Sequence, residues 1–330
     1  MIGMNKRVGA VIAALLGLFF TSLDARAQAY PSRSVKMIMP SPPAGSPDRV
    51  TRLVANRLQQ RWGQPVVVEN RPGATTMVGT EYVIKQPPDG YTLLATFTSL
   101  VQAPALFDKV PYDWERDLVP ISQFIRSEVI LLDRADSPWK TLQDFLVAAR
   151  VAAKSGHPLS YGSFGNGSSF HIYGEALKRA TGIELVHVPY KGEAQSLTDL
   201  LGGQISVNFN SIGTALPHLR GGKVRALALV SSVRSKAWPE VPTFPELGVA
   251  SLDQSGWFGL FAPAGTPRPI VDRIAADVAQ VLALPDVTAS LREQGLEPVG
   301  SAPDEFAKFL RANAANWKRL AQENGIRAEQ

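Results

Sequence analysis

Residues 35–63, VKMIMPSPPAGSPDRVTRLVANRLQQRWG, indicate the class of fold. The apolar run Val35–Met39 predicts a buried strand, and a turn rich in proline and glycine follows it. Ser46 and Pro47 favour the start of a helix, because serine caps a helix N-terminus and proline suits its first position. Apolar residues then recur at helical spacing until Gly63 ends the helix. The stretch is therefore a strand–turn–helix unit.

The same alternation of short apolar strands and longer helical patterns runs through the rest of the chain, which is typical of an α/β fold with largely parallel sheets. Further strands are expected at Val66–Glu69, Tyr91–Thr96, Leu159–Gly162, Glu184–Val188, Ile205–Asn208, Val224–Val230 and Gly256–Ala262. Helices are expected to begin near Phe170, Glu193 and Thr214 and to fill Ile270–Leu282, Val287–Gln294 and Asp304–Asn324.

Two such strand–helix sets predict two lobes. They are joined by 119–133 and 253–263, so we expect the chain to cross twice between them. We predict one lobe from 30–127 together with 253–330, and a second lobe from 128–252. A cleft between lobes is a common place for a small-ligand site.

The first 29 residues predict a secretory signal peptide. Lys6 and Arg7 precede the apolar run Val11–Phe20, and small residues at A-x-A spacing end at Ala27 and at Ala29. The run is shorter than the ~20 apolar residues of a membrane-spanning helix. We expect cleavage after Ala27 or Ala29 and a mature protein in the periplasm; an uncleaved N-terminal anchor is the alternative.

The composition of the 330-residue chain excludes several classes of protein. There is no cysteine, so neither a disulfide nor the lipid-bearing cysteine of a bacterial lipoprotein is possible. The formal net charge is +5, and no basic run with interleaved aromatic residues points to nucleic acid. A mildly basic balance is compatible with an anionic small ligand.

The strongest local signal is the glycine-rich loop 161–171, YGSFGNGSSFH, between a predicted strand and a predicted helix. Glycines let backbone N–H groups approach a ligand, and Ser168 and Ser169 lie at a helix N-terminus, which favours an anion. Capping of the helix by a serine explains the same residues, so both interpretations stay open. The loop Pro42–Ser46 repeats the arrangement in the first lobe. Two helix N-termini facing one cleft are well placed to hold a carboxylate.

Other polar residues have two interpretations each. His171 and Glu175 have the spacing of a metal pair, but a structural polar pair is favoured because the chain has four histidines and no H-E-x-x-H. Ser168 and His171 also resemble the nucleophile and base of a serine hydrolase, although no G-x-S-x-G elbow is present. Lys191 is either a ligand-binding or a solvated surface residue, and the cluster 208–211 offers either neutral donors or a turn.

From Tyr30 onwards the chain resembles the Bug-type periplasmic solute-binding receptors of tripartite tricarboxylate transporters. The most specific motif is RWGQPVVVENRPG at 61–73, followed by PDGYTLL at 88–94. The loop 161–171, the motif VPYKG at 188–192, ALPH at 215–218, WFG at 257–259 and PAGTP at 263–267 add to it in the same order.

The resemblance implies a type II periplasmic-binding-protein ("Venus flytrap") fold, with mixed, mostly parallel sheets and two crossovers. It implies a receptor, not an enzyme, that acts as a monomer without metal or cofactor and passes a small carboxylate to membrane permease subunits. A sensor that signals to a membrane kinase and a serine hydrolase are the alternatives. The resemblance, with the clusters above, implies these ligand-binding residues: Ala44, Gly45, Ser46, Asp48, Phe97, Thr98, Phe164, Gly165, Asn166, Gly167, Ser168, Ser169, His171, Tyr190, Lys191, Gly192 and Asn210.

The chain also departs from the family pattern in ways that bear on the ligand. Pro43 and Ala44 stand where alanine and glycine are common, whereas Asp48 is retained. Phe164 and Phe170 add aromatic bulk around the glycine-rich loop. We hypothesise an aromatic or otherwise bulky carboxylate that stacks on these rings, with a dicarboxylate as the other candidate.

Overall fold

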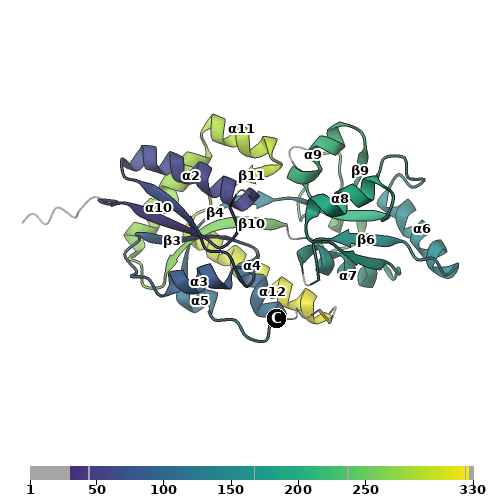
Figure 1. Cartoon of the computed structure of the whole chain (residues 1–330), viewed down its shortest axis with the longest axis horizontal. Helices are drawn as coiled ribbons and strands as arrows, with labels where there is room; N and C mark the ends of the chain where they lie inside the picture. The colour runs from purple at the N-terminus through teal and green to yellow at the C-terminus, as the bar shows by residue number, and fades with distance from the viewer. Residues whose placement is uncertain are drawn as a thin grey trace, which may run out of the picture.

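The computed structural model describes residues 30–43, 45–166, 168–235, 238–253, 255–323 and 325–326. The predicted signal peptide and both of its cleavage positions lie outside the described residues, as do Ala44 and Gly167. The structure consists of two lobes, each built around one β-sheet (Figure 1).

The first lobe contains a six-stranded sheet in the order β11-β4-β10-β3-β1-β2. Figure 1 shows α2, α10 and α11 on one face of this sheet and α3, α4 and α12 on the other. Its strands are β1 Val35–Met39, β2 Val66–Asn70, β3 Thr92–Phe97, β4 Leu118–Ser127, β10 Gly256–Pro263 and β11 Leu296–Pro298. Its helices are α2 Ser46–Trp62, α3 Met77–Ile84, α4 Ser99–Leu106, α5 Trp114–Asp117, α10 Arg268–Leu282, α11 Pro285–Glu293 and α12 Pro303–Glu323.

The second lobe contains a five-stranded sheet in the order β7-β6-β8-β5-β9. Its strands are β5 Val129–Arg134, β6 Ser160–Ser163, β7 Val186–Pro189, β8 Val207–Ser211 and β9 Val224–Val230. Its helices are α6 Leu142–Lys154, α7 Ser169–Thr181, α8 Glu193–Leu201 and α9 Ile212–Arg220, with a short 3₁₀ helix at Pro245–Leu247.

The connection predicted at 119–133 consists mostly of strands. β4 and β5 occupy it, and only Glu128 separates them, so one extended segment passes from the first sheet into the second. The chain returns between β9 and β10. The lobe boundaries at 127/128 and 252/253 stay a prediction.

Both sheets are mixed, as predicted, but the expectation that they are mostly parallel is wrong. Among the described strands, four pairs are parallel and five are antiparallel. Every antiparallel pair contains β4, β5 or β10, the strands next to the crossovers. β5 and β10 each enter a sheet from the other lobe, so no strand–helix–strand connection within one sheet sets their direction.

Helix α2 ends as predicted and begins one residue earlier than predicted. Gly63 closes it in the left-handed conformation, with its N–H bonded to the carbonyl of Gln59. The N-cap is Gly45 and not Ser46, which is the first helical residue. Pro47 fits either register, since it lacks the N–H that the first turn leaves unpaired.

No single helix among the described residues is long and apolar enough to cross a membrane; α10 and α11 meet that test only as a pair bent by 73°.

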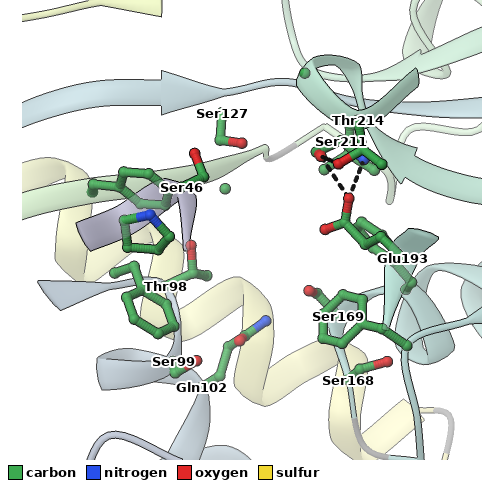
Figure 2. A pocket seen from close by; sticks show the side chains of 18 of the residues that line it. Ser46, Thr98, Ser99, Gln102, Ser127, Ser168, Ser169, Glu193, Ser211 and Thr214 are labelled. Carbon is green, nitrogen blue, oxygen red and sulfur yellow. Dashed lines mark hydrogen bonds between the residues drawn. The ribbon is translucent and has the colours of Figure 1, made fainter. Parts of the chain in front are cut away.

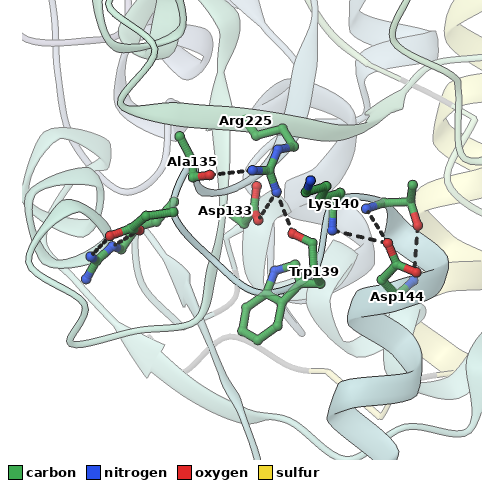
Figure 3. Close-up of polar contacts among 9 residues, drawn as sticks. Asp133, Ala135, Trp139, Lys140, Asp144 and Arg225 are labelled. Atoms are coloured by element: carbon green, nitrogen blue, oxygen red, sulfur yellow. Dashed lines mark hydrogen bonds and ion pairs between the residues drawn. The ribbon is translucent and has the colours of Figure 1, made fainter.

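We expect the stability of the protein to depend on pH through an ion pair between Asp133 and Arg225 in the second lobe (Figure 3). The Asp133 carboxylate lies 3.2 Å from Nη1 of Arg225. Nη1 also donates to the carbonyl of Trp139, and Nη2 donates to the carbonyl of Ala135. Burial raises the pKa of Asp133 from 3.8 to about 7, against the opposing effect of Arg225. The pKa of Asp133 is higher in the folded state than in the unfolded state. Its contribution to the free energy of unfolding is therefore fully present below pH 4 and is lost as the pH rises towards 7.

Asp133→Asn should remove this dependence. We expect urea unfolding at several pH values between 4 and 7 to show the free energy of unfolding of the variant rising relative to wild type as the pH rises. Parallel pH profiles for the two proteins would contradict the expectation.

Candidate ligand-binding cleft

A cleft of about 710 Å³ lies between the lobes (Figure 2). Its walls include residues that follow the carboxyl ends of β1 and β3 in the first lobe and of β6, β7 and β8 in the second. Open α/β sheets generally bind ligands outside the carboxyl ends of their strands. The cleft is therefore where the fold itself favours a site.

Five of the described helices begin at this cleft, two from the first lobe and three from the second. The residues concerned are Ser46 of α2, Ser99 of α4, Ser169 of α7, Glu193 of α8, and Ser211, which caps α9. The first N–H groups of a helix have no partner within the helix, and they carry the positive end of its dipole. Convergence of several such ends favours an anion.

The first-lobe wall adds neutral polar groups and apolar surface. The Thr98 hydroxyl accepts a hydrogen bond from the backbone N–H of Trp257 at 3.0 Å, which ties the start of α4 to β10. Gln102 on α4 is 6% exposed, and its Nε2 has no hydrogen-bond partner among the described residues. Phe97 and Phe258 form an edge-to-face pair with ring centres 6.1 Å apart. This wall suits a guest with an apolar body and an acceptor group.

On the second-lobe wall, Ser168 both caps a helix and lines the cleft. Its Oγ accepts from the backbone N–H of His171 at 3.3 Å and donates to the carbonyl of Gly165 at 2.6 Å. Gly165 has φ 125°, a conformation that favours glycine. The hydroxyl therefore orders the loop through backbone bonds.

Charged groups at the cleft are few. Among the described lining residues, Arg49 is the one cation, and Glu193 and Glu293 are the carboxylates. Glu193 accepts from the N–H of Ser211 at 3.2 Å and from its hydroxyl at 2.5 Å. An anion bound here is held chiefly by helix N-termini and hydroxyls.

The residues that were predicted to bind ligand and that the structure describes fall into two groups. Those that line the cleft are Ser46, Phe97, Thr98, Phe164, Asn166, Ser168 and Ser169. Those that do not line it are Gly45, Asp48, Gly165, His171, Tyr190, Lys191, Gly192 and Asn210.

Most of the second group supports the loops that line the cleft. Gly45 and Gly192 are the N-caps of α2 and α8. Asp48 is buried and accepts from Asn70 at 2.8 Å, which joins α2 to β2. The Tyr190 hydroxyl donates to Asp199 at 2.8 Å, whereas Lys191 is exposed.

Two histidines form a stack behind the glycine-rich loop. His171 lies on His187 with ring centres 4.1 Å apart, and burial lowers the pKa of both, that of His187 to about 4. Glu175 accepts from the Tyr161 hydroxyl and from Lys178, both at 2.8 Å. In the described part of the chain, no three His, Asp or Glu side chains are grouped as a metal site.

Several lining residues are absent from the prediction. They include Gln102, Ser127, Glu193, Thr214 and Phe258. Glu193 and Thr214 share a signal, because each is a polar residue in the first turn of a helix that follows a strand. Ser127 and Phe258 lie on strands and carry no such signal.

A family model described as tripartite tricarboxylate transporter family receptor matches residues 50–326. Protein BugT of Bordetella pertussis is 34% identical over 97% of this chain and 98% of its own. A structure of R. palustris Rpa4515 with adipate has a TM-score of 0.76 at 32% identity, covering 90% of this chain and 99% of that one. MatC (Rpa3494) from Rhodopseudomonas palustris with bound malate has a TM-score of 0.71 at 31% identity, covering 88% and 99%.

These similarities span both lobes and exclude the serine hydrolase alternative, because the family consists of solute-binding receptors that are not enzymes. The chain therefore belongs to the tripartite tricarboxylate transporter family of receptors, which are periplasmic binding proteins of the two-lobed α/β type.

Proposed function

We propose that this receptor captures a small carboxylate in the interlobe cleft and delivers it to membrane permease subunits. The observation that carries the proposal is the convergence of five helix N-termini on a cleft with a single lining cation among the described residues. Similar proteins with bound adipate and malate support a carboxylate guest.

The energies are sufficient without a metal. Hydrogen bonds to a charged group contribute roughly 1.5–3 kcal/mol each, and micromolar affinity needs about 8 kcal/mol. Several bonds from both lobes reach this range after the costs of desolvation and ordering. Gln102, whose Nε2 lacks a partner among the described residues, supplies one further donor.

The body of the guest meets aromatic side chains on both walls. Phe164 and Phe170 pack edge to face with ring centres 4.5 Å apart, so part of their surface is taken up by each other. Phe97 and Phe258 line the opposite wall. We propose a guest with an apolar body; a benzoate-type ring and an aliphatic chain are the two forms to compare.

Capture is proposed to take place in the periplasm, after removal of residues 1–27 or 1–29 by signal peptidase. The monomeric receptor closes its two lobes, 30–127 with 253–330 and 128–252, by hinge motion at the two crossovers. Closure shields the carboxylate from water and forms the surface that docks on the permease.

A carboxylate screen tests the proposal. We expect one or more small carboxylates to raise the melting temperature, since a ligand at 100 times its Kd stabilises the native state by about 2.7 kcal/mol. Small-angle scattering with that ligand should show a smaller radius of gyration. The matching primary amides serve as controls and should not bind. If no benzoate, aliphatic monocarboxylate or dicarboxylate shifts the melting temperature, the proposal fails.

A further inference from the structure

Glu193 places a carboxylate on the second-lobe wall of the cleft (Figure 2). It is the first residue of α8, and its Oε2 accepts two hydrogen bonds from Ser211, the N-cap of α9. The Ser211 and Thr214 hydroxyls are in turn hydrogen-bonded at 3.0 Å. The side chain is therefore fixed across the start of a neighbouring helix.

This position of Glu193 makes the starts of α7 and α9 unequal as places for a bound anion. The positive end of α9 already faces the negative charge of Glu193, so a second anion gains little there. At the start of α7, by contrast, the described lining residues Ser168, Ser169 and Phe170 are neutral. The guest carboxylate is therefore favoured at α7 and disfavoured at α9.

Glu193 has no cationic partner within the described part of the chain. No lysine, arginine or histidine nitrogen there lies within 4.0 Å of its carboxylate oxygens, and the one lining cation, Arg49, belongs to α2 of the first lobe. Figure 2 shows the second oxygen of Glu193 directed into the cleft. When the lobes close and water leaves, a carboxylate in this position is costly unless a positive group reaches it.

We propose that Glu193 selects a guest that carries an ammonium group at the end remote from its carboxylate. The inference rests on the proposed function and names the substrate class of the same cleft. The guest carboxylate lies at the start of α7, and its ammonium donates to the free oxygen of Glu193. A dicarboxylate of equal length places like charge against Glu193 and is disfavoured.

Matched linear probes test the proposal by calorimetry: 6-aminohexanoate, 6-hydroxyhexanoate and adipate, each with its shorter homologues. We expect the wild-type receptor to bind the amino acid at least tenfold more tightly than the diacid of the same chain length, which is about 1.4 kcal/mol. Glu193→Gln keeps the size and an acceptor for Ser211 but removes the charge. It should weaken binding of the amino acid at least tenfold and strengthen binding of the diacid.

Glu184→Gln is the matched control, because Glu184 is an exposed carboxylate of the same lobe that does not line the cleft; it should change neither affinity. A wild-type preference for the diacid, or equal affinities for the amino and hydroxy acids, overturns the inference and leaves carboxylate capture intact. Absence of binding by every carboxylate, aromatic ones included, overturns the proposed function as well. The wild-type comparison decides the matter even if the variant is unstable.

Discussion

Ser169→Asp is expected to weaken carboxylate binding at least 100-fold without lowering the stability of the protein. Ser169 is the first residue of α7 and lines the cleft, and Figure 2 shows it on the second-lobe wall. An aspartate there brings a negative charge to the place where the guest carboxylate is proposed to lie. A loss of 100-fold corresponds to about 2.7 kcal/mol, which is within the range for one charged hydrogen bond and like-charge repulsion combined.

Stability should behave differently from binding in this variant. Acidic residues in the first turn of a helix are stabilising, by about 0.3–1 kcal/mol, because they face the positive end of the dipole. We therefore expect an unchanged or slightly higher melting temperature, so weaker binding cannot be attributed to unfolding. Calorimetry with the best ligand of the screen measures the first effect, and thermal unfolding measures the second.

Thr141→Asp provides a matched control for the change of charge. Thr141 is the N-cap of α6, in the same lobe, and it does not line the cleft. The control should retain wild-type affinity. If Ser169→Asp binds the ligand as tightly as the control does, the start of α7 is not where the carboxylate lies.

Trp257→Ala is expected to have the largest effect on stability, a loss of about 3–5 kcal/mol in the free energy of unfolding. Trp257 on β10 is fully buried and packs against the rings of Phe261 and Phe306, with centres 6.1 and 5.5 Å away. Its Nε1 donates to Asn313 of α12 at 3.0 Å. The alanine variant thus leaves a cavity between sheet and helix and removes a buried hydrogen bond.

Trp257→Phe separates these two contributions, because it keeps most of the ring volume and removes only the N–H donor. We expect it to lose less than half of the free energy that the alanine variant loses. Urea unfolding followed by circular dichroism measures both variants. A loss below about 1 kcal/mol for Trp257→Ala would show that α12 is not anchored by this contact.

Local sequence pattern predicted features that depend on residues a few positions apart, such as strand bounds and helix ends. The strands at Val35–Met39 and Val224–Val230 have the predicted bounds, and Gly63 ends its helix as expected. These features depend on side chains a few residues apart, so periodicity and cap chemistry are enough to find them. Helices α4, α5 and α6 are not among the predicted elements; in α4 the internal Pro104 argues against a helix.

The 118–134 segment shows where local pattern is insufficient. The polar residues Arg126, Ser127 and Glu128 interrupt its apolar pattern at the predicted boundary of 127/128, but no glycine or proline accompanies them. The local pattern therefore does not show that strands of two different sheets meet at Glu128. That division depends on pairing with distant strands, β10 on one side and β8 with β9 on the other. The separation of the two lobes by a single residue is thus a tertiary feature.

For the binding site, local pattern is enough to show that serine and glycine follow strands and begin helices, which places unpaired N–H groups at the ends of strand–turn–helix units. Which of these ends share a cleft depends on long-range contacts. The strand order β7-β6-β8 brings the starts of α7, α8 and α9 to one edge of the second sheet, where they face α2 and α4 of the first lobe. The same order puts the carboxylate of Glu193 on the N-cap of α9, 18 residues away in the chain. Helix-end chemistry is local and can be found from neighbouring residues, whereas the direction in which each end points is fixed by long-range strand pairing.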